Sequence, residues 1–338
     1  MKDLIAWDNQ KLEPVLITYN RSMDLQRTLA AFIDAGLTFI KMHILDNAST
    51  DETAAVVATA QAQWPNLSYH KNTYNIGGNA NILRAVEMAA SEYSWIIGDD
   101  DAWHLQDISE LCSVLHEGKA DVIRLGWLVS PQSRGQLMEA AELALKEKLF
   151  FASLSMISAS IIRRDIIKHH LPHAYMGISD AYPQLVSILR SIGQRPLQTY
   201  TVQHDLMTHT PSTTPGYYFG DLEWCSSWFR MSRFLEVQKL RRIFVGEVAS
   251  YMSRNSPGSL NEFMVLVKIA LNYKALGVNQ WPYLLSMLAY GSGWCGRVVS
   301  LMVIYGILPM KVAAWLRKIY FIVRGRPDKG LRFDRTRL

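Results

Sequence analysis

The chain has 338 residues, of which 49% are hydrophobic and 19% charged, and its formal net charge is +5. This composition is that of a folded protein with one large domain or two ordinary ones, and it excludes a disordered chain. Its three cysteines, Cys112, Cys225 and Cys295, lie far apart without a CxxC pair, which argues against a disulfide framework and a zinc ribbon.

Strand-like and helix-like patterns alternate over the first hundred or so residues. The predicted strands span residues 15–19, 39–45, 67–70 and 94–98. The predicted helices between them span residues 25–33, about 49–63 and 79–90. Ser49 and Glu52 have the spacing of a capping box at the start of the second helix. Such an alternation predicts a mainly parallel sheet with helices on both faces.

Polar residues follow three of these strands. Thr18, Tyr19 and Asn20 lie at the end of the first strand, Asp46 and Asn47 at the end of the second, and three aspartates at the end of the fourth. In parallel sheets ligands bind beyond the carboxyl ends of the strands. We therefore expect the three loops to converge on one cleft.

The three aspartates, Asp99, Asp100 and Asp101, are consecutive. Adjacent carboxylates repel one another and lose hydration when partly buried, and a divalent cation between them relieves both costs. The triplet therefore indicates a metal site for a phosphate-bearing substrate. The alternative is an acidic loop before a helix that begins near Leu105, because aspartate is favoured at helix N-termini.

The alternation becomes looser beyond residue 119. The predicted elements are a strand at 121–127, a helix at 139–150, an apolar stretch of small residues at 152–162 and an amphipathic helix at 179–192. A loop rich in proline, threonine and glycine at 208–220 has the length of a lid. After Asp221 the pattern is helical.

Two apolar segments, 281–296 and 298–310, lie near the C-terminus, and neither reaches the ~20 residues that span a bilayer. Between Arg297 and Leu338 the chain has ten lysines and arginines against two aspartates. This combination favours a helical hairpin at the surface of a membrane with anionic lipid. The alternative is a buried helical subdomain with a solvated basic tail.

Four segments, in this order, resemble the family 2 glycosyltransferases of the GT-A fold. They are 14–21 (PVLITYNR), 45–51 (LDNASTD), 72–78 and 98–101 (GDDD). The resemblance is close over about residues 13–130, looser over 150–215 and slight beyond. It implies an α/β fold with a Rossmann-like, mainly parallel sheet flanked by helices and a C-terminal helical extension. It also implies a nucleotide-diphosphate sugar donor and Mg²⁺ or Mn²⁺ as cofactor.

The resemblance implies roles for the aspartates. Asp101 would be the main metal ligand, Asp99 would assist directly or through water, and Asp100 would lie toward the ribose. Among the downstream histidines, His209 would complete the metal shell, and His204 is a weaker candidate. The alternative for both histidines is a solvated position in a loop.

The resemblance also implies the nucleotide-binding residues. Asp46, beside Asn47, would accept a hydrogen bond from the base, and Thr18, Tyr19 and Arg21 would lie beside base and ribose. The turn Asn75-Ile76-Gly77-Gly78-Asn79 would let the backbone approach the nucleotide, since Gly77 and Gly78 permit close contact. The alternatives are a plain strand end at Asp46, core packing for Tyr19 and an ordinary turn at 75–79.

An inverting transfer needs a carboxylate that removes the proton of the acceptor hydroxyl. By resemblance this base is Asp180, which opens a predicted helix, where the helix N-terminus would favour the ionised form. The family more often has Glu-Asp where this chain has Ser179-Asp180, and a plain N-cap is the alternative. Asp165 is the reserve candidate, with a surface ion pair as its alternative. Trp224, Trp228 and Phe229 either stack on an acceptor sugar or, as we favour, pack in a helical core.

The resulting hypothesis is a metal-dependent, inverting glycosyltransferase of bacterial surface-polysaccharide synthesis, such as O-antigen or capsule. Its acceptor would be a lipid-linked glycan. Residues 1–220 would form the catalytic domain and 221–338 a mainly helical region with a membrane-surface segment at about 281–338. Because residues 1–9 lack the apolar core of a signal peptide, we expect a cytoplasmic protein, peripheral at the inner face of the cell membrane. We expect no nucleic-acid binding, since the donor site is acidic.

Two other functions fit the same elements. A sugar-phosphate nucleotidyltransferase shares the sheet and a metal-binding aspartate, but residues 15–20 lack the glycine of its phosphate loop. A non-catalytic nucleotide- or glycan-binding protein is disfavoured by the intact aspartate triplet and an available Asp180.

Overall fold

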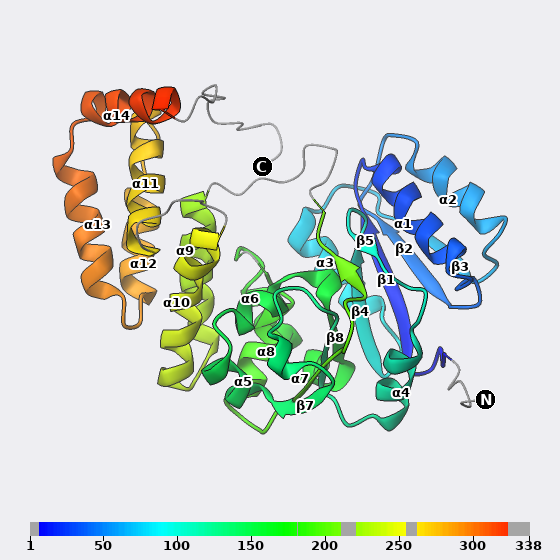
Figure 1. The fold of residues 1–338 in the computed structure, drawn as a ribbon. Coiled ribbons are helices and arrows are strands. Elements are labelled where there is room, and N and C mark those ends of the chain that lie inside the picture. Colours follow the sequence, from blue (N-terminus) through cyan, green and yellow to red (C-terminus); the bar gives the residue numbers. More distant parts are fainter. Residues whose placement is uncertain (1–6, 181, 211–220, 255–261, 324–338) are drawn as a thin grey trace. The chain divides into compact units, whose positions relative to one another are not determined.

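The computed structural model describes residues 7–180, 182–210, 221–254 and 262–323. The chain divides into two compact units, Met1–Gly216 and Tyr217–Leu338. Each unit is described by itself (Figure 1).

The first unit is built on an eight-stranded sheet with the order β3-β2-β1-β4-β8-β6-β9-β7. Its strands are β1 (Leu12–Thr18), β2 (Met42–Asp46), β3 (Leu67–Lys71), β4 (Tyr93–Gly98), β6 (Val122–Arg124), β7 (Gln136–Glu139), β8 (Ser160–Arg163) and β9 (Gln198–Thr201). Strands β3, β2, β1 and β4 are parallel neighbours, as are β6 and β9, whereas β8 and β7 are antiparallel to their neighbours. The predicted α/β fold with a mainly parallel sheet is confirmed.

Helices follow the strands and flank the sheet (Figure 1). They are α1 (Ser22–Asp34), α2 (Thr53–Gln61), α3 (Gly78–Met88), α4 (Ser109–Glu117), α5 (Ala140–Lys146), α6 (Phe150–Ser155), α7 (Arg164–Met176) and α8 (Leu185–Ile192), with short 3-10 helices η1 (Pro131–Ser133) and η2 (Ile157–Ala159). A separate two-stranded antiparallel sheet pairs β5 (Ala102–Trp103) with β10 (Met207–Thr208).

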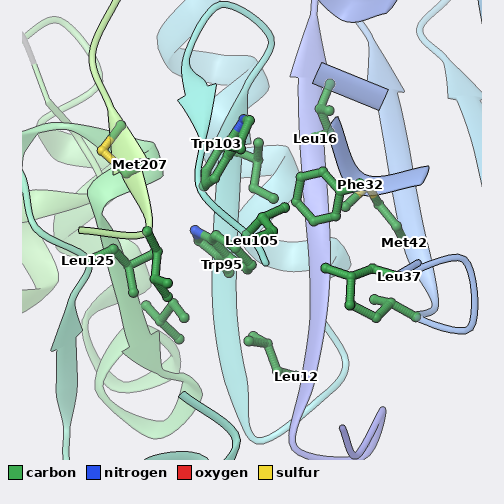
Figure 2. Close-up of a cluster of buried hydrophobic side chains, with 14 of the residues drawn as sticks. Leu12, Leu16, Phe32, Leu37, Met42, Trp95, Trp103, Leu105, Leu125 and Met207 are labelled. Carbon is green, nitrogen blue, oxygen red and sulfur yellow. The ribbon is translucent and has the colours of Figure 1, made fainter. Parts of the chain in front are cut away.

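An aromatic cluster holds α1 against the sheet. Phe32 of α1 lies 5.9 Å from Trp64, 6.3 Å from Trp95 and 5.7 Å from Trp103, measured between ring centroids. Figure 2 shows Phe32 among Leu16, Trp95 and Trp103. Aromatic rings bury large apolar areas, so this cluster fixes the position of α1. As a result Thr28 of α1 donates a hydrogen bond to the backbone oxygen of Asp99, at 2.8 Å.

Two predictions about helix starts are wrong. Helix α2 begins at Thr53 with Glu52 at its N-cap and without a Ser49–Glu52 capping box, and the carboxylate of the preceding Asp51 accepts from the backbone N–H of Thr53 at 3.1 Å. The Ser49 hydroxyl instead accepts from the backbone N–H of Asn20 at 2.9 Å, joining two loops. The aspartate triplet caps no helix near Leu105, because it leads into β5 and α4 begins only at Ser109.

The structure divides the later predicted elements more finely. The predicted helix at 139–150 is α5, ending at Lys146, and α6 starts at Phe150. The apolar stretch at 152–162 holds the end of α6 and most of the antiparallel strand β8. The predicted helix at 179–192 is shorter, since α8 begins at Leu185. Helix α7 was not predicted, and it carries a proline, Pro172, in its interior.

All regular elements among the described residues of the second unit are helices. Its helices are α9 (Asp221–Met231), α10 (Gln238–Arg254), α11 (Glu262–Ala275), α12 (Trp281–Tyr290), α13 (Cys295–Ile307) and α14 (Met310–Val323), with a 3-10 helix η3 (Ser232–Phe234). Trp228 and Phe229 are buried, and Trp228 stacks on Phe244 with 4.4 Å between ring centroids. Core packing, the favoured interpretation, is confirmed for these two residues.

No single helix of the described ranges has the length and apolarity to cross a bilayer. Helices α13 and α14 meet that criterion only as a pair, which is bent by 101°. The basic tail from residue 324 onward lies outside the described residues, as does the expected lid from residue 211 onward.

Candidate active site

The carboxyl ends of β1, β2 and β4 meet at one edge of the sheet. The register pairs Thr18 with Asp46 across β1 and β2, and Ile17 with Gly98 across β1 and β4. The three polar loops predicted from the sequence therefore lie side by side. Their convergence follows from parallel strands that end at the same level.

Asp99 is the centre of a buried ionic cluster. Its Oδ2 accepts from the Thr18 hydroxyl at 2.7 Å, and its Oδ1 lies 3.1 Å from Nη1 of Arg21. The same Arg21 nitrogen lies 2.9 Å from Asp100 Oδ2. Burial raises the pKa of Asp99 to about 6, while Arg21 and Thr18 act in the opposite direction. Arg21 thus neutralises part of the charge of the triplet.

Asp101 lies beside a histidine from a distant part of the chain. Its carboxylate is 2% exposed, and Oδ1 lies 3.2 Å from Nδ1 of His209. The pairing of β5 with β10, which sets Met207 opposite Trp103, brings His209 to this place. The hydrogen bond to Asp101 raises the pKa of His209. His204, the weaker candidate, is exposed.

These residues supply part of a metal-binding set. Asp101 and His209 present a carboxylate oxygen and an imidazole nitrogen to each other, both of which are metal ligands. Asp99 is engaged by Thr18 and Arg21. Across the described ranges, no group of three or more His, Cys, Asp or Glu side chains is arranged to hold a metal ion. A cation here would therefore need further ligands from substrate or water, which is the usual situation for Mg²⁺.

Asp46 is fully buried and hydrogen-bonded on both oxygens. Oδ1 accepts from the backbone N–H of Ser49 at 2.8 Å, and Oδ2 accepts from the Tyr69 hydroxyl at 2.6 Å. Tyr69 comes from the neighbouring strand β3, and burial followed by this hydrogen bond raises its pKa. The Asp46 carboxylate therefore shapes its own loop, while its contact with a base stays a prediction. Sequence reasoning missed Tyr69, which only the strand register connects to Asp46.

Asparagine side chains bind the turn before α3 to the end of β2. Asn47 donates to Asn75 Oδ1 at 2.8 Å, and the Asn47 Oδ1 atom accepts from Asn72 at 3.0 Å and from the backbone of Ile76 at 3.0 Å. Asn72 also donates to Asn81 at 2.9 Å. Several asparagines lie close together in the sequence around residues 72–81 and could have indicated such a network. From the sequence, nevertheless, no role was assigned to Asn72 or Asn81.

Gly77 of this turn has a φ of +84°, which glycine adopts readily. A Cβ at Gly77 or Gly78 would meet nothing within 4 Å in the described structure. Glycine at position 77 is therefore explained by its positive φ, and not by a lack of space for a side chain. Tyr19, on the loop after β1, is half-buried.

Asp180 is fully buried and lies in the connection between α7 and α8. It does not open a helix, because α8 begins at Leu185 with Gln184 as its N-cap, so both the helix-dipole argument and the N-cap alternative are wrong. Asn79 donates to the backbone oxygen of Asp180 at 2.6 Å and to that of Ile178 at 2.9 Å. The reserve candidate, Asp165, has a side chain 65% exposed and 3.9 Å from Arg195, which fits a surface ion pair.

Residues 15–175 match the sequence model of the protein family described as Glycosyl transferase family 2. The matched segment, just under half of the chain, has the sequence of a family 2 glycosyltransferase domain. An abequosyltransferase, RfbV, from Salmonella typhimurium is 34% identical over 113 residues, which cover 31% of this chain and 32% of that protein. A GalNAc(5)-diNAcBac-PP-undecaprenol β-1,3-glucosyltransferase from Campylobacter jejuni is 23% identical over 47% of this chain and 53% of that protein. The matches therefore span about a third to a half of these two relatives.

The crystal structure of S. aureus TarS 1-349 in complex with UDP-GlcNAc superposes with a TM-score of 0.56. The superposition covers 95% of this chain and 94% of TarS 1-349, at 13% sequence identity. At this identity the likeness concerns the fold. It agrees with the parallel sheet and flanking helices described above, which are those of the GT-A fold.

Proposed function

We propose that the protein transfers a sugar from a nucleotide-diphosphate donor to a glycan acceptor. The observation that carries the proposal is the convergence of Thr18, Arg21 and the aspartate triplet at the carboxyl edge of the sheet, with His209 3.2 Å from Asp101. The two relatives named above are a sugar transferase for abequose and one for glucose, and TarS was crystallised with UDP-GlcNAc. These names support the same reaction class.

At the donor end of the site, hydrogen bonds would position the aspartate triplet, and charged groups would stabilise the diphosphate of the donor. Thr18 and Arg21 hold the Asp99 carboxylate in place, so the triplet keeps one geometry as the donor enters. Asp101 and His209 would hold Mg²⁺ or Mn²⁺, with Asp99 assisting through water. Such an ion, when bound, neutralises the charge that develops on a departing diphosphate. Arg21, which is cationic at every relevant pH, would add a fixed positive charge at the same edge.

Asp180 would act as the base. An inverting transfer requires a carboxylate that takes the proton of the acceptor hydroxyl as the oxygen attacks the anomeric carbon. Asn79 ties the backbone of Asp180 to the first turn of α3, which supports a defined place for this segment near the turn that precedes α3. The inverting outcome rests on this role and on the family.

The acceptor would be a lipid-linked glycan of a bacterial surface polysaccharide. The Campylobacter relative is named for an undecaprenol-linked acceptor, which supports this choice. The localisation proposed with it is cytoplasmic, at the inner face of the cell membrane.

The first experiment measures the melting temperature with a panel of nucleotide diphosphates and Mn²⁺, because a ligand that binds the native state raises it. The second measures turnover of the sugar nucleotide that carries the stabilising base, for the wild type and Asp101→Ala. We expect Asp101→Ala to lose turnover by at least about a hundredfold, the order of a lost electrostatic stabiliser, and to lose Mn²⁺-dependent stabilisation. Asp34→Ala, an exposed aspartate at the end of α1, is the control and should keep both.

Three outcomes would contradict the proposal. Unchanged turnover in Asp101→Ala would overturn the metal assignment. Release of pyrophosphate from a nucleoside triphosphate and a sugar phosphate would assign a nucleotidyltransferase. If nucleotides raise the melting temperature but no acceptor mixture supports turnover, the protein would be a non-catalytic binding protein with this fold.

A further inference from the structure

Helix α14 exposes an apolar face. Ala313 is its only buried residue among those the structure describes in this helix. The exposed apolar side chains recur at helical spacing: Val312, Trp315, Leu316, Ile319, Ile322 and Val323. At 3.6 residues per turn these positions fall within about a third of the circumference of the helix. An apolar stripe of this width normally packs against a core, so its exposure needs a partner outside the unit.

Helix α13 continues the exposed apolar surface. Val299, Val303 and Ile307 are exposed and follow one another at intervals of four residues, and Ile307 is 78% exposed. The buried residues of the same helix, Val298 and Leu301 among them, lie on another side. Figure 1 shows α14 turning sharply away from α13, in agreement with the 101° bend. The last residue of the α13 stripe, Ile307, is five positions from the first residue of the α14 stripe, Val312.

The charged residues of α13 and α14 have one sign. They are Arg297 in α13 and Lys311, Arg317 and Lys318 in α14, and neither helix contains an aspartate or glutamate. Lys311 and Lys318 are exposed and lie next to the apolar face on the circumference of α14. Cations beside an apolar face favour a surface that is anionic and apolar at once.

We infer that the exposed face of α13 and α14 binds the surface of a bilayer that contains anionic lipid, with α14 lying in the plane of the interface. At 1.5 Å per residue, α14 is about 21 Å long, shorter than the ~30 Å hydrocarbon core, which suits an interfacial position. A second copy of this chain is a poorer occupant, because two copies of a surface with cations alone would repel each other. The inference makes specific the membrane-surface location given with the proposed function and rests on it in that respect, while its test does not use the transfer activity.

The test measures sedimentation of the full chain with vesicles of phosphatidylcholine, with and without phosphatidylglycerol, in the absence of donor and acceptor. We expect binding to the anionic vesicles that weakens as salt is raised, and little binding to the neutral ones. The double variant Lys311→Glu and Lys318→Glu should lower the partition coefficient by at least about tenfold, since each basic residue near the surface contributes to binding. A second double variant, Trp315→Ser with Ile322→Ser, tests the apolar contribution. It should weaken vesicle binding at high salt as well.

The matched control is Lys119→Glu with Lys148→Glu, which makes the same change of charge on exposed residues of the first unit. It should bind like the wild type, and circular dichroism should show the same helix content in every variant. Equal loss in the control, or equal binding to neutral and anionic vesicles, would overturn the inference. A dimer without lipid that Trp315→Ser dissociates would assign the face to a second copy instead.

Discussion

The side chain of Asn79 donates a hydrogen bond to the backbone oxygen of Asp180 at 2.6 Å, joining two segments 101 positions apart in sequence. The same nitrogen donates to Ile178 at 2.9 Å. Asn79 thus connects the first turn of α3, directly after one of the proposed donor loops, to the segment that carries the proposed base. A catalytic group displaced by about 1 Å can lose about a hundredfold in rate.

Removing this connection should slow turnover more than it weakens donor binding. For Asn79→Ala we expect kcat to fall about ten- to a hundredfold, with nucleotide-dependent stabilisation largely kept. The control is Asn66→Ala, since Asn66 also donates to a backbone oxygen, that of Phe39, at the other end of the sheet. Equal kcat values in the two variants would show that Asn79 does not position Asp180.

The Arg21–Asp99 pair should respond asymmetrically to the loss of each partner. Arg21→Met leaves two carboxylates without their cation and should lower the free energy of unfolding by about 1–3 kcal/mol. Asp99→Asn should cost less, because burial already favours the uncharged form and an amide oxygen can still accept from Thr18. Urea unfolding of both single variants and the double variant gives the coupling energy. A larger loss in Asp99→Asn than in Arg21→Met would contradict this order.

A buried ion pair beyond the active-site residues should be important for stability. Nη2 of Arg124 lies 2.6 Å from Oε2 of Glu147, with side chains 1% and 6% exposed. Arg124→Met should lower the free energy of unfolding by about 3–5 kcal/mol, since Glu147 would keep a buried charge without its partner. Lys146→Met, which breaks an exposed pair with Glu142, should cost less than about 0.5 kcal/mol. Similar urea midpoints for the two variants would contradict the argument.

His70 should make the protein less stable in mild acid. Burial, together with His43 and Arg84, lowers the pKa of His70 in the folded state. The unfolded chain therefore binds more protons near the ordinary pKa of histidine, about 6.5, and the contribution of His70 to stability is lost as pH falls through that value. In unfolding titrations between about pH 7.5 and 5.5, His70→Gln should show a smaller loss than the wild type. An identical pH dependence of the two proteins would refute this.

Much of the site could be predicted because its signals are local. The apolar runs, the turns and the helix patterns each depend on neighbouring residues, and a repeated strand and helix dictate a parallel sheet. Once the sheet is parallel, Thr18, Asp46 and Asp99 must lie at one edge, which the register confirms. Helix boundaries were less predictable, since the start of α8 at Leu185 depends on tertiary packing and removed Asp180 from a helix N-terminus.

The sequence by itself determined the resemblance of the first half of the chain to family 2 glycosyltransferases, the order of the first strands and helices and the residues at the carboxyl edge of the sheet. Periodicity and motif spacing are properties of short segments, which is why they could be read locally. Only the tertiary structure decided which side chains meet across long separations. The pairing of β5 with β10 brings His209 to Asp101, and the register of β2 and β3 brings Tyr69 to Asp46. Such contacts depend on strand order and loop path, which no local pattern records.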